Sequence, residues 1–215
     1  MKKIIFILFL FCLLYSCYYI YDITENKNTN ILLIGDDIVN NPYLNNNAGV
    51  INKDFVNRDY RINDINDIIT YNKELDIDNK TESIHRLLKE YDIVIISIGM
   101  NDIYYKLGDN TKEIYTFLND MLNSYENILK EISRYDNHNI YILGYYNATY
   151  RYNDIFTYVN YKLNKMINKY GYNYIDLNKV LSNNEKYYLK KDNFYLNNEG
   201  YYKIYELIVE KIKKY

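Results

Sequence analysis

The amino-acid sequence predicts a three-layer α/β/α fold built on a doubly wound parallel sheet. Short unbroken apolar runs, such as those at 31–35 and 93–98, are typical of strands that are buried on both faces. Between these runs lie segments in which apolar residues recur every three or four positions, as in amphipathic helices. Strands that alternate with helices in this way favour right-handed crossovers and a parallel sheet covered on both sides.

The expected elements follow from these two periods. Strands are predicted at 31–35, near 55–56, and at 93–98, 140–143 and, more weakly, 172–177. Helices are predicted near 65–69 and at 84–88, 114–132, 155–167 and 204–212. Asn110 and Glu113 are placed to cap the helix at 114–132, and Gly171 to end the helix at 155–167. The segment 36–80 is rich in Asn and Asp and is the least regular part of the chain.

The N-terminus has the pattern of an export or anchor segment. Lys2 and Lys3 precede an apolar run at 4–20, which is at the short limit for a helix that spans a bilayer. The run either stays as a membrane anchor or is a lipoprotein signal, since Leu-Tyr-Ser-Cys at 14–17 resembles a lipobox and would make Cys17 the lipidated residue. Both alternatives place the rest of the chain on the extracytoplasmic face of the membrane.

The chain therefore divides into a signal or anchor segment at 1–21, a polar tether at 22–30 and one domain at 31–215. Both cysteines precede the tether, so the domain has no disulfide and no thiolate metal site. The net charge of −2, without a basic patch, argues against a nucleic-acid partner. The 30 tyrosines match a composition drawn from A/T-rich codons, which explains them without a dedicated aromatic surface.

Ligands of doubly wound sheets bind where the parallel strands end. The polar and aromatic residues that follow the predicted strands are therefore the first candidates for a site. They are Asp36 and Asp37, Asn101 and Asp102, Tyr145, Tyr146 and Asn147, and the segment before the last helix.

Three of these strand ends resemble motifs of the SGNH hydrolases, the GDSL-type esterases and lipases. Gly-Asp-Asp-Ile at 35–38 stands where the family has Gly-Asp-Ser-Leu, and Gly-Met-Asn-Asp at 99–102 matches Gly-x-Asn-Asp. Asp-Asn-Phe-Tyr-Leu-Asn at 192–197 stands where the family has Asp-x-x-His-Leu-Asn. The resemblance covers about 31–212 and implies a flavodoxin-like α/β/α architecture, carboxylic ester hydrolysis and no cofactor.

The resemblance also exposes two catalytic positions that differ from the family. It places the catalytic groups at Asp37, Asn101, Asp192 and Tyr195, but the nucleophilic Ser is Asp37 and the base His is Tyr195. A tyrosine phenol keeps its proton at neutral pH and is a poor base. Asn101, as oxyanion donor, and Asp192, as partner of the base, are the family groups that remain.

The two histidines are weak substitutes for the missing base. His138 precedes its predicted strand, which places it at the opposite end of the sheet. His85 lies near the start of a predicted helix and could face the edge of the site.

Three hypotheses follow for the function. The first is a catalytically inactive domain, anchored to the membrane, whose crevice binds an envelope glycan or a protein partner. Its crevice residues, beside Asn101, would be Asp36, Gly99, Asp102, Tyr104, Tyr105, Tyr145, Tyr146 and Asn147.

The second hypothesis is an ester hydrolase that uses Asp37 in an altered mechanism. The third is a divalent metal site lined by Asp36, Asp37, Asp102 and Asp192, since carboxylates that share a crevice need a cation or a proton. The alternative to the metal is that Asp36 and Asp102 cap loops or helices by accepting backbone N–H bonds.

Overall fold

A computed structural model describes residues 30–45, 51–77, 80–108, 110–135, 139–190 and 194–212. Its central feature is a five-stranded sheet in the order β2-β1-β5-β6-β7, in which every neighbouring pair is parallel. Its strands are β1 (Asn30–Gly35), β2 (Ile51–Val56), β5 (Ile93–Ser97), β6 (Asn139–Leu143) and β7 (Asn173–Ile175). An antiparallel hairpin of β3 (Glu74–Ile77) and β4 (Lys80–Ser83) lies beside it.

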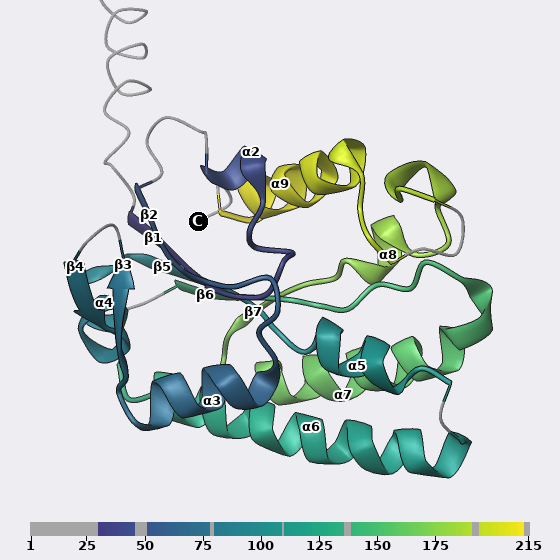
Figure 1. Ribbon diagram of the computed structural model, residues 1–215, viewed down its shortest axis with the longest axis horizontal. Helices are drawn as coiled ribbons and strands as arrows, with labels where there is room; N and C mark the ends of the chain where they lie inside the picture. The colour runs from purple at the N-terminus through teal and green to yellow at the C-terminus, as the bar shows by residue number, and fades with distance from the viewer. Residues whose placement is uncertain are drawn as a thin grey trace, which may run out of the picture.

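Helices cover both faces of the sheet (Figure 1). One face carries α3 (Ile62–Thr70), α6 (Thr111–Ile132) and α7 (Asn153–Lys169), and the other carries α2 (Pro42–Asn45) and α9 (Asn198–Ile212). The shorter helical elements are α4 (Ile84–Glu90), α5 (Met100–Lys106), η1 (Tyr150–Tyr152), α8 (Asn178–Leu181) and η2 (Glu185–Tyr187). The predicted three-layer α/β/α sheet is confirmed.

The core lies on both sides of the central strands β1 and β5. Leu32, Leu33, Val94 and Ile95 are completely buried, because a helix layer covers each face of these strands. Strands buried on both faces need apolar residues at consecutive positions rather than at every second one, which is the pattern of 31–35 and 93–98.

The predicted helix ends are also confirmed. The Asn110 side chain accepts a 3.0 Å hydrogen bond from the Glu113 backbone N–H and so caps α6. Gly171 follows α7 with a φ of +72°, the left-handed conformation that ends many helices. The Asn110 cap therefore fixes where α6 begins, and Gly171 fixes where α7 ends.

The structure differs from the expected elements in several places. The last strand covers Asn173–Ile175 rather than 172–177, since Leu177 already leads into α8. Asn30, assigned above to the tether, is the first residue of β1. Helix α5 was not expected, because its 7 residues are too few to show a period, and neither were α2, α8 and the β3–β4 hairpin.

The predicted anchor segment at 1–21, including Cys17, lies outside the described residues, as do Asp192 and His138. Among the residues that are described, none of the helices has the length and apolar character needed to cross a bilayer.

Candidate functional site

The carboxyl ends of β1, β2 and β5 meet at one edge of the sheet. The Asp36 N–H donates to the Ser97 carbonyl at 2.9 Å, and the Asn57 N–H donates to the Gly35 carbonyl at 3.1 Å. A Cβ on Gly35 would stand 1.7 Å from the Ser97 carbonyl oxygen, so glycine is required for this close approach. We call this edge, with Asp37, Asn101 and Tyr195 around it, the strand-end site.

Asp36 is a buried structural carboxylate of this site. Its Oδ1 accepts hydrogen bonds from the Ile38 N–H and the Ser97 hydroxyl, both at 3.2 Å. Its Oδ2 is buried and has no hydrogen-bond partner. Burial raises the pKa of Asp36 from 3.8 to about 7, against the lowering effect of these hydrogen bonds. Asp36 therefore holds a loop and does not face a ligand.

Asp37, which the motif resemblance places at the nucleophile position, is hydrogen-bonded to α9. The Tyr201 hydroxyl donates to Asp37 Oδ2 at 2.7 Å. Burial and the Asp37 carboxylate raise the pKa of Tyr201 above its usual value, so the phenol stays a donor near neutral pH. One oxygen of the carboxylate that would have to attack an ester is thus already engaged.

Asn101, at the position of the oxyanion donor, is engaged in the same way. Helix α5 begins after Gly99, whose φ is +105°, and this turn directs the Asn101 side chain toward the loop that follows β2. Its Nδ2 donates to the Arg58 carbonyl at 2.8 Å and to the Tyr60 carbonyl at 3.0 Å. An amide nitrogen has two hydrogens, so both are used and neither is left for an oxyanion.

Asp102 caps helix α3. Its Oδ2 accepts the Ile62 N–H at 3.0 Å. Burial raises the pKa of Asp102, while this hydrogen bond and the charge of Arg61 oppose the rise. The expectation that Asp36 and Asp102 accept backbone N–H bonds is confirmed.

Tyr195, at the position of the family base, lies at the rim of the site. Its side chain is 50% exposed, and the Arg58 guanidinium lies 5.3 Å from its ring centroid. The charge of Arg58 also acts on Tyr201, where it opposes the rise in pKa that burial and Asp37 cause. Arg58 therefore connects Asn101, Tyr195 and the Tyr201–Asp37 pair, and the structure brings three of the four expected catalytic positions to one edge. The fourth, Asp192, lies outside the described residues.

Two of the four aromatic residues expected to line a crevice, Tyr145 and Tyr146, are buried, and Tyr104 is partly buried. The Tyr145 hydroxyl donates to the Ile98 carbonyl and the Tyr146 hydroxyl to the Phe194 carbonyl, each at 3.0 Å. The Tyr104 ring packs 4.2 Å from that of Phe194. Tyr104 and Tyr146 thus support Phe194, next to Tyr195, while Tyr145 supports the end of β5.

Of the remaining expected crevice residues, two are buried and one is exposed. Gly99 is buried under Tyr145, whose hydroxyl would lie 2.7 Å from an added Cβ. Asn147 is fully buried and its Nδ2 donates to Asn153 Oδ1 at 2.8 Å. Tyr105, by contrast, is 67% exposed with the Arg61 guanidinium 4.7 Å from its ring centroid.

His85 does not reach the strand-end site, so the suggestion that it faces the site edge is wrong. Its Nε2 lies 2.7 Å from the carbonyl of Ile69, near the end of α3, and its ring packs against Tyr135, just after α6. Both helices end at the amino edge of the sheet, because each runs antiparallel to the strands it covers.

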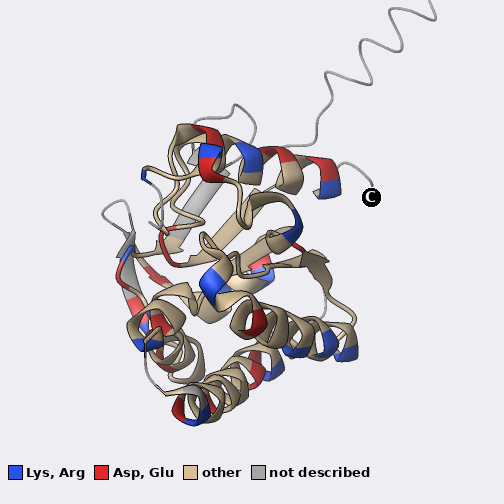
Figure 2. Cartoon of the chain, turned by 90° about the vertical axis from the view of Figure 1, so that its right-hand side faces the viewer, with Lys and Arg blue, Asp and Glu red and all other residues tan. Residues whose placement is uncertain are grey.

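The expected metal site has little support among the described side chains. No group of three or more His, Cys, Asp or Glu is arranged there to hold a metal ion. Figure 2 shows Lys and Arg interspersed with Asp and Glu over the described helices of that view, in keeping with the net charge of −2.

Sequence reasoning missed Arg58, Tyr60 and Tyr201 as members of the site. Tyr201 follows Gly200 just after the third motif and was available as a signal. Arg58 and Tyr60 lie in the irregular segment 36–80, and nothing in their spacing pointed to Asn101.

The model of one protein family, described as GDSL-like lipase/acylhydrolase, matches residues 40–208. The chain belongs to this family. The match begins after Asp37, so it does not cover the strand end where the motif resemblance places the nucleophile. A search of curated proteins found no relative.

Solved structures with a similar fold are esterases and lipases. The acetyl xylan esterase AlAXEase is 11% identical with a TM-score of 0.62, and the match covers 85% of this chain and 99% of that one. A catalytic mutant of Axe2, an acetylxylan esterase from Geobacillus stearothermophilus, is 13% identical over 86% and 94%, with a TM-score of 0.62. The lipase Lip_vut3 from a goat rumen metagenome is 15% identical over 84% and 96%, with a TM-score of 0.64. At these identities the likeness shows the SGNH-type fold of the domain.

Proposed function

We propose that this protein is a catalytically inactive member of the GDSL-like family that binds a ligand or a partner rather than hydrolysing esters. The observation that carries the proposal is the hydrogen bonding of Asp37 and Asn101, the residues expected to act as nucleophile and oxyanion donor. Asp37 Oδ2 accepts the Tyr201 hydroxyl, and the Asn101 amide donates to two backbone carbonyls. One oxygen of Asp37 and both hydrogens of the Asn101 amide are therefore already engaged, so no free oxyanion donor is left there.

The missing base supports the same proposal. Tyr195 replaces the family His, and its ring lies under the Arg58 guanidinium. A phenol is a poor base at neutral pH, so opening a carboxylic anhydride formed on Asp37 would need another base. His85 does not supply this base, since its Nε2 lies against the Ile69 carbonyl near the end of α3 and not at the strand-end site.

The test is ester hydrolysis by the full-length protein in mild detergent, with p-nitrophenyl acetate and an acetylated xylooligosaccharide as substrates. We expect the same rate as with Asp37→Ala, and no rate above that of buffer. Turnover that Asp37→Ala abolishes would overturn the proposal in favour of hydrolysis through Asp37. Turnover that survives Asp37→Ala would also overturn it, because another group would then be catalytic.

Hydrolysis through Asp37 is the second candidate, and the fold gives it a specific reason. Acetyl xylan esterases share this fold, and Asp37 stands at the strand end with its second oxygen outside the Tyr201 bond. A carboxylate can attack an ester carbonyl and form an anhydride as the C–O bond to the alcohol breaks and the alcohol leaves with a proton from water. Water then hydrolyses the anhydride, which releases the acid and restores the carboxylate. Without a free oxyanion donor the first step gains little, so we place this function second.

We also propose that the segment 1–21 attaches the domain to the extracytoplasmic face of a membrane. The charge and hydropathy of this segment support the proposal. Cell fractionation with metabolic palmitate labelling separates the two kinds of anchor. Label that Cys17→Ser abolishes indicates a lipoprotein, membrane association without label indicates a helical anchor, and a protein recovered free of membranes contradicts both.

A further inference from the structure

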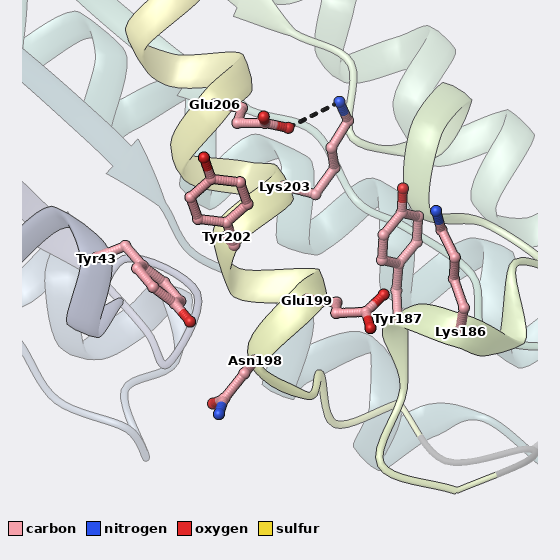
Figure 3. A pocket seen from close by; sticks show the side chains of 8 residues that line it. All are labelled: Tyr43, Lys186, Tyr187, Asn198, Glu199, Tyr202, Lys203 and Glu206. Carbon is pink, nitrogen blue, oxygen red and sulfur yellow. Dashed lines mark hydrogen bonds and ion pairs between the residues drawn. The ribbon is translucent and has the colours of Figure 1, made fainter.

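A hollow of about 370 Å³ lies on the outer side of α9, between this helix, α2 and η2. Figure 3 shows three tyrosine rings around it, Tyr43 from α2, Tyr187 from η2 and Tyr202 from α9, with Asn198 and Glu199 from the first turn of α9 beside them. Its volume is at the lower end of the roughly 300–1,000 Å³ that small-molecule sites occupy.

The hollow is separate from the strand-end site because the two lie on opposite faces of α9. Glu199, Tyr202 and Glu206 are three or four residues apart and line the hollow. Ile204 and Ile208 are buried on the opposite face, and Tyr201, on that side, donates to Asp37. A ligand in the hollow would therefore touch none of the family's catalytic positions.

The charges around the hollow are balanced. Lys203 forms a 3.0 Å ion pair with Glu206, and Figure 3 shows this pair at the wall. Lys186 lies 4.6 Å from the ring centroid of Tyr187. Together with Glu199, the walls carry as many carboxylates as ammonium groups, so the hollow selects neither a strong anion nor a strong cation.

The remaining chemistry combines the exposed ring of Tyr202 and the partly buried ring of Tyr43 with hydrogen-bond donors and acceptors, whereas Tyr187 is nearly buried. Tyr43 and Tyr202 meet edge to face, with ring centroids 5.3 Å apart, and Tyr202 is 46% exposed. The Asn198 amide, the Glu199 carboxylate and the tyrosine hydroxyls lie within the same lining. Sugar rings have apolar C–H faces that stack on aromatic rings, and hydroxyl groups that both donate and accept.

We propose that this hollow binds one or two rings of a neutral carbohydrate chain. The inference rests on the proposed function, that of a domain that binds without hydrolysing, and it places the binding on α9 rather than at the strand ends. The aromatic pair would hold the sugar ring, while Asn198 and Glu199 would bind its hydroxyls. An open hollow of this size suits the end or a short stretch of an extended chain.

The test is binding of xylotriose, cellotriose and triacetylchitotriose to the full-length protein in mild detergent, measured by isothermal titration calorimetry and ligand-observed NMR. We expect at least one to bind with a Kd of roughly 0.1–10 mM, and Tyr202→Ala to weaken that binding about tenfold or more. The matched control is Tyr71→Ala, which removes another exposed tyrosine, just after α3 and away from the hollow.

Three outcomes would overturn the inference. The first is that none of the three sugars binds in this range, and the second is that Tyr202→Ala and Tyr71→Ala bind equally well. The third is that analytical ultracentrifugation shows a dimer that Tyr202→Ala dissociates, since a second copy of the chain would then cover the hollow. The hydrolysis assay is independent of all three, because ester turnover would overturn the proposed function without changing sugar binding.

Discussion

Tyr201 donates a 2.7 Å hydrogen bond to Asp37 Oδ2, so a side chain of α9 engages the carboxylate that the motif resemblance places at the family's nucleophile position. The two residues are 164 positions apart in the chain. The bond ties the last helix to the end of the first strand. We expect this hydrogen bond to stabilise the fold at the position where the motif resemblance places the nucleophile.

Replacing Tyr201 by Phe removes this bond and keeps the ring. We expect a loss of roughly 1–2 kcal/mol in the free energy of unfolding, since the bond has a charged acceptor and is half-buried. Urea unfolding of the two proteins measures the difference. Tyr202→Phe on the solvent side of α9 is the matched control and should change stability little. Equal stability of both variants would contradict a stabilising role of the bond.

Asp36 predicts a pH dependence of stability. Its pKa is about 7 in the folded protein against 3.8 as the ordinary value, so the folded state holds the proton more tightly. The stability from this group is complete below about pH 4, falls as the pH rises, and levels off above about pH 7. The span corresponds to a loss on the order of 4 kcal/mol.

Asp36→Asn removes the titrating group while its Oδ1 can still accept from Ile38 and Ser97. We therefore expect the decline between pH 4 and pH 7 to be smaller than in the wild type, as measured by urea unfolding at a series of pH values. Asp154→Asn, at an exposed position of α7, should keep the wild-type slope. A slope that Asp36→Asn leaves unchanged would show that other groups cause the decline.

Gly35→Ala should prevent folding or cost more than about 3 kcal/mol. The new Cβ would meet the Ser97 carbonyl oxygen at 1.7 Å, and β1 and β5 cannot separate without breaking the sheet. Gly108→Ala is the control, because Gly108 also has a positive φ, of +112°, but no atom lies within 4 Å of its Cβ position. Backbone strain alone should cost Gly108→Ala roughly 1–3 kcal/mol. Circular dichroism and thermal unfolding compare the two, and equal losses would show that the close approach is unimportant.

The pair Asp37→Ser and Tyr195→His restores the family residues at the nucleophile and base positions. We expect the double variant to stay folded and to hydrolyse p-nitrophenyl acetate weakly, above the wild type and both single variants, because a hydroxyl and an imidazole base are then present. The rate should stay low while the Asn101 amide donates to Arg58 and Tyr60. A well-folded and wholly inert double variant would show that the site has diverged beyond these two positions.

The sequence by itself determined the architecture, since the signals involved are local. Apolar runs at 31–35 and 93–98 specify doubly buried strands, and caps such as Asn110 and Gly171 fix helix ends, because each depends on residues a few positions apart. The same runs located the strand ends, and hence Asp37 and Asn101, at one edge of the sheet.

The tertiary structure decided what the side chains at that edge do. Asn101 donates to Arg58 and Tyr60, some forty residues earlier, and Asp37 accepts from Tyr201 at the far end of the chain. These bonds form because the loop after β2 and the helix α9 fold back over the strand ends. No spacing within the sequence encodes such contacts. The same folding creates the hollow between Tyr43 and Tyr202, which lie on helices near opposite ends of the domain sequence. The sequence placed the candidate residues, but the packing of distant segments decided that they hold the fold together.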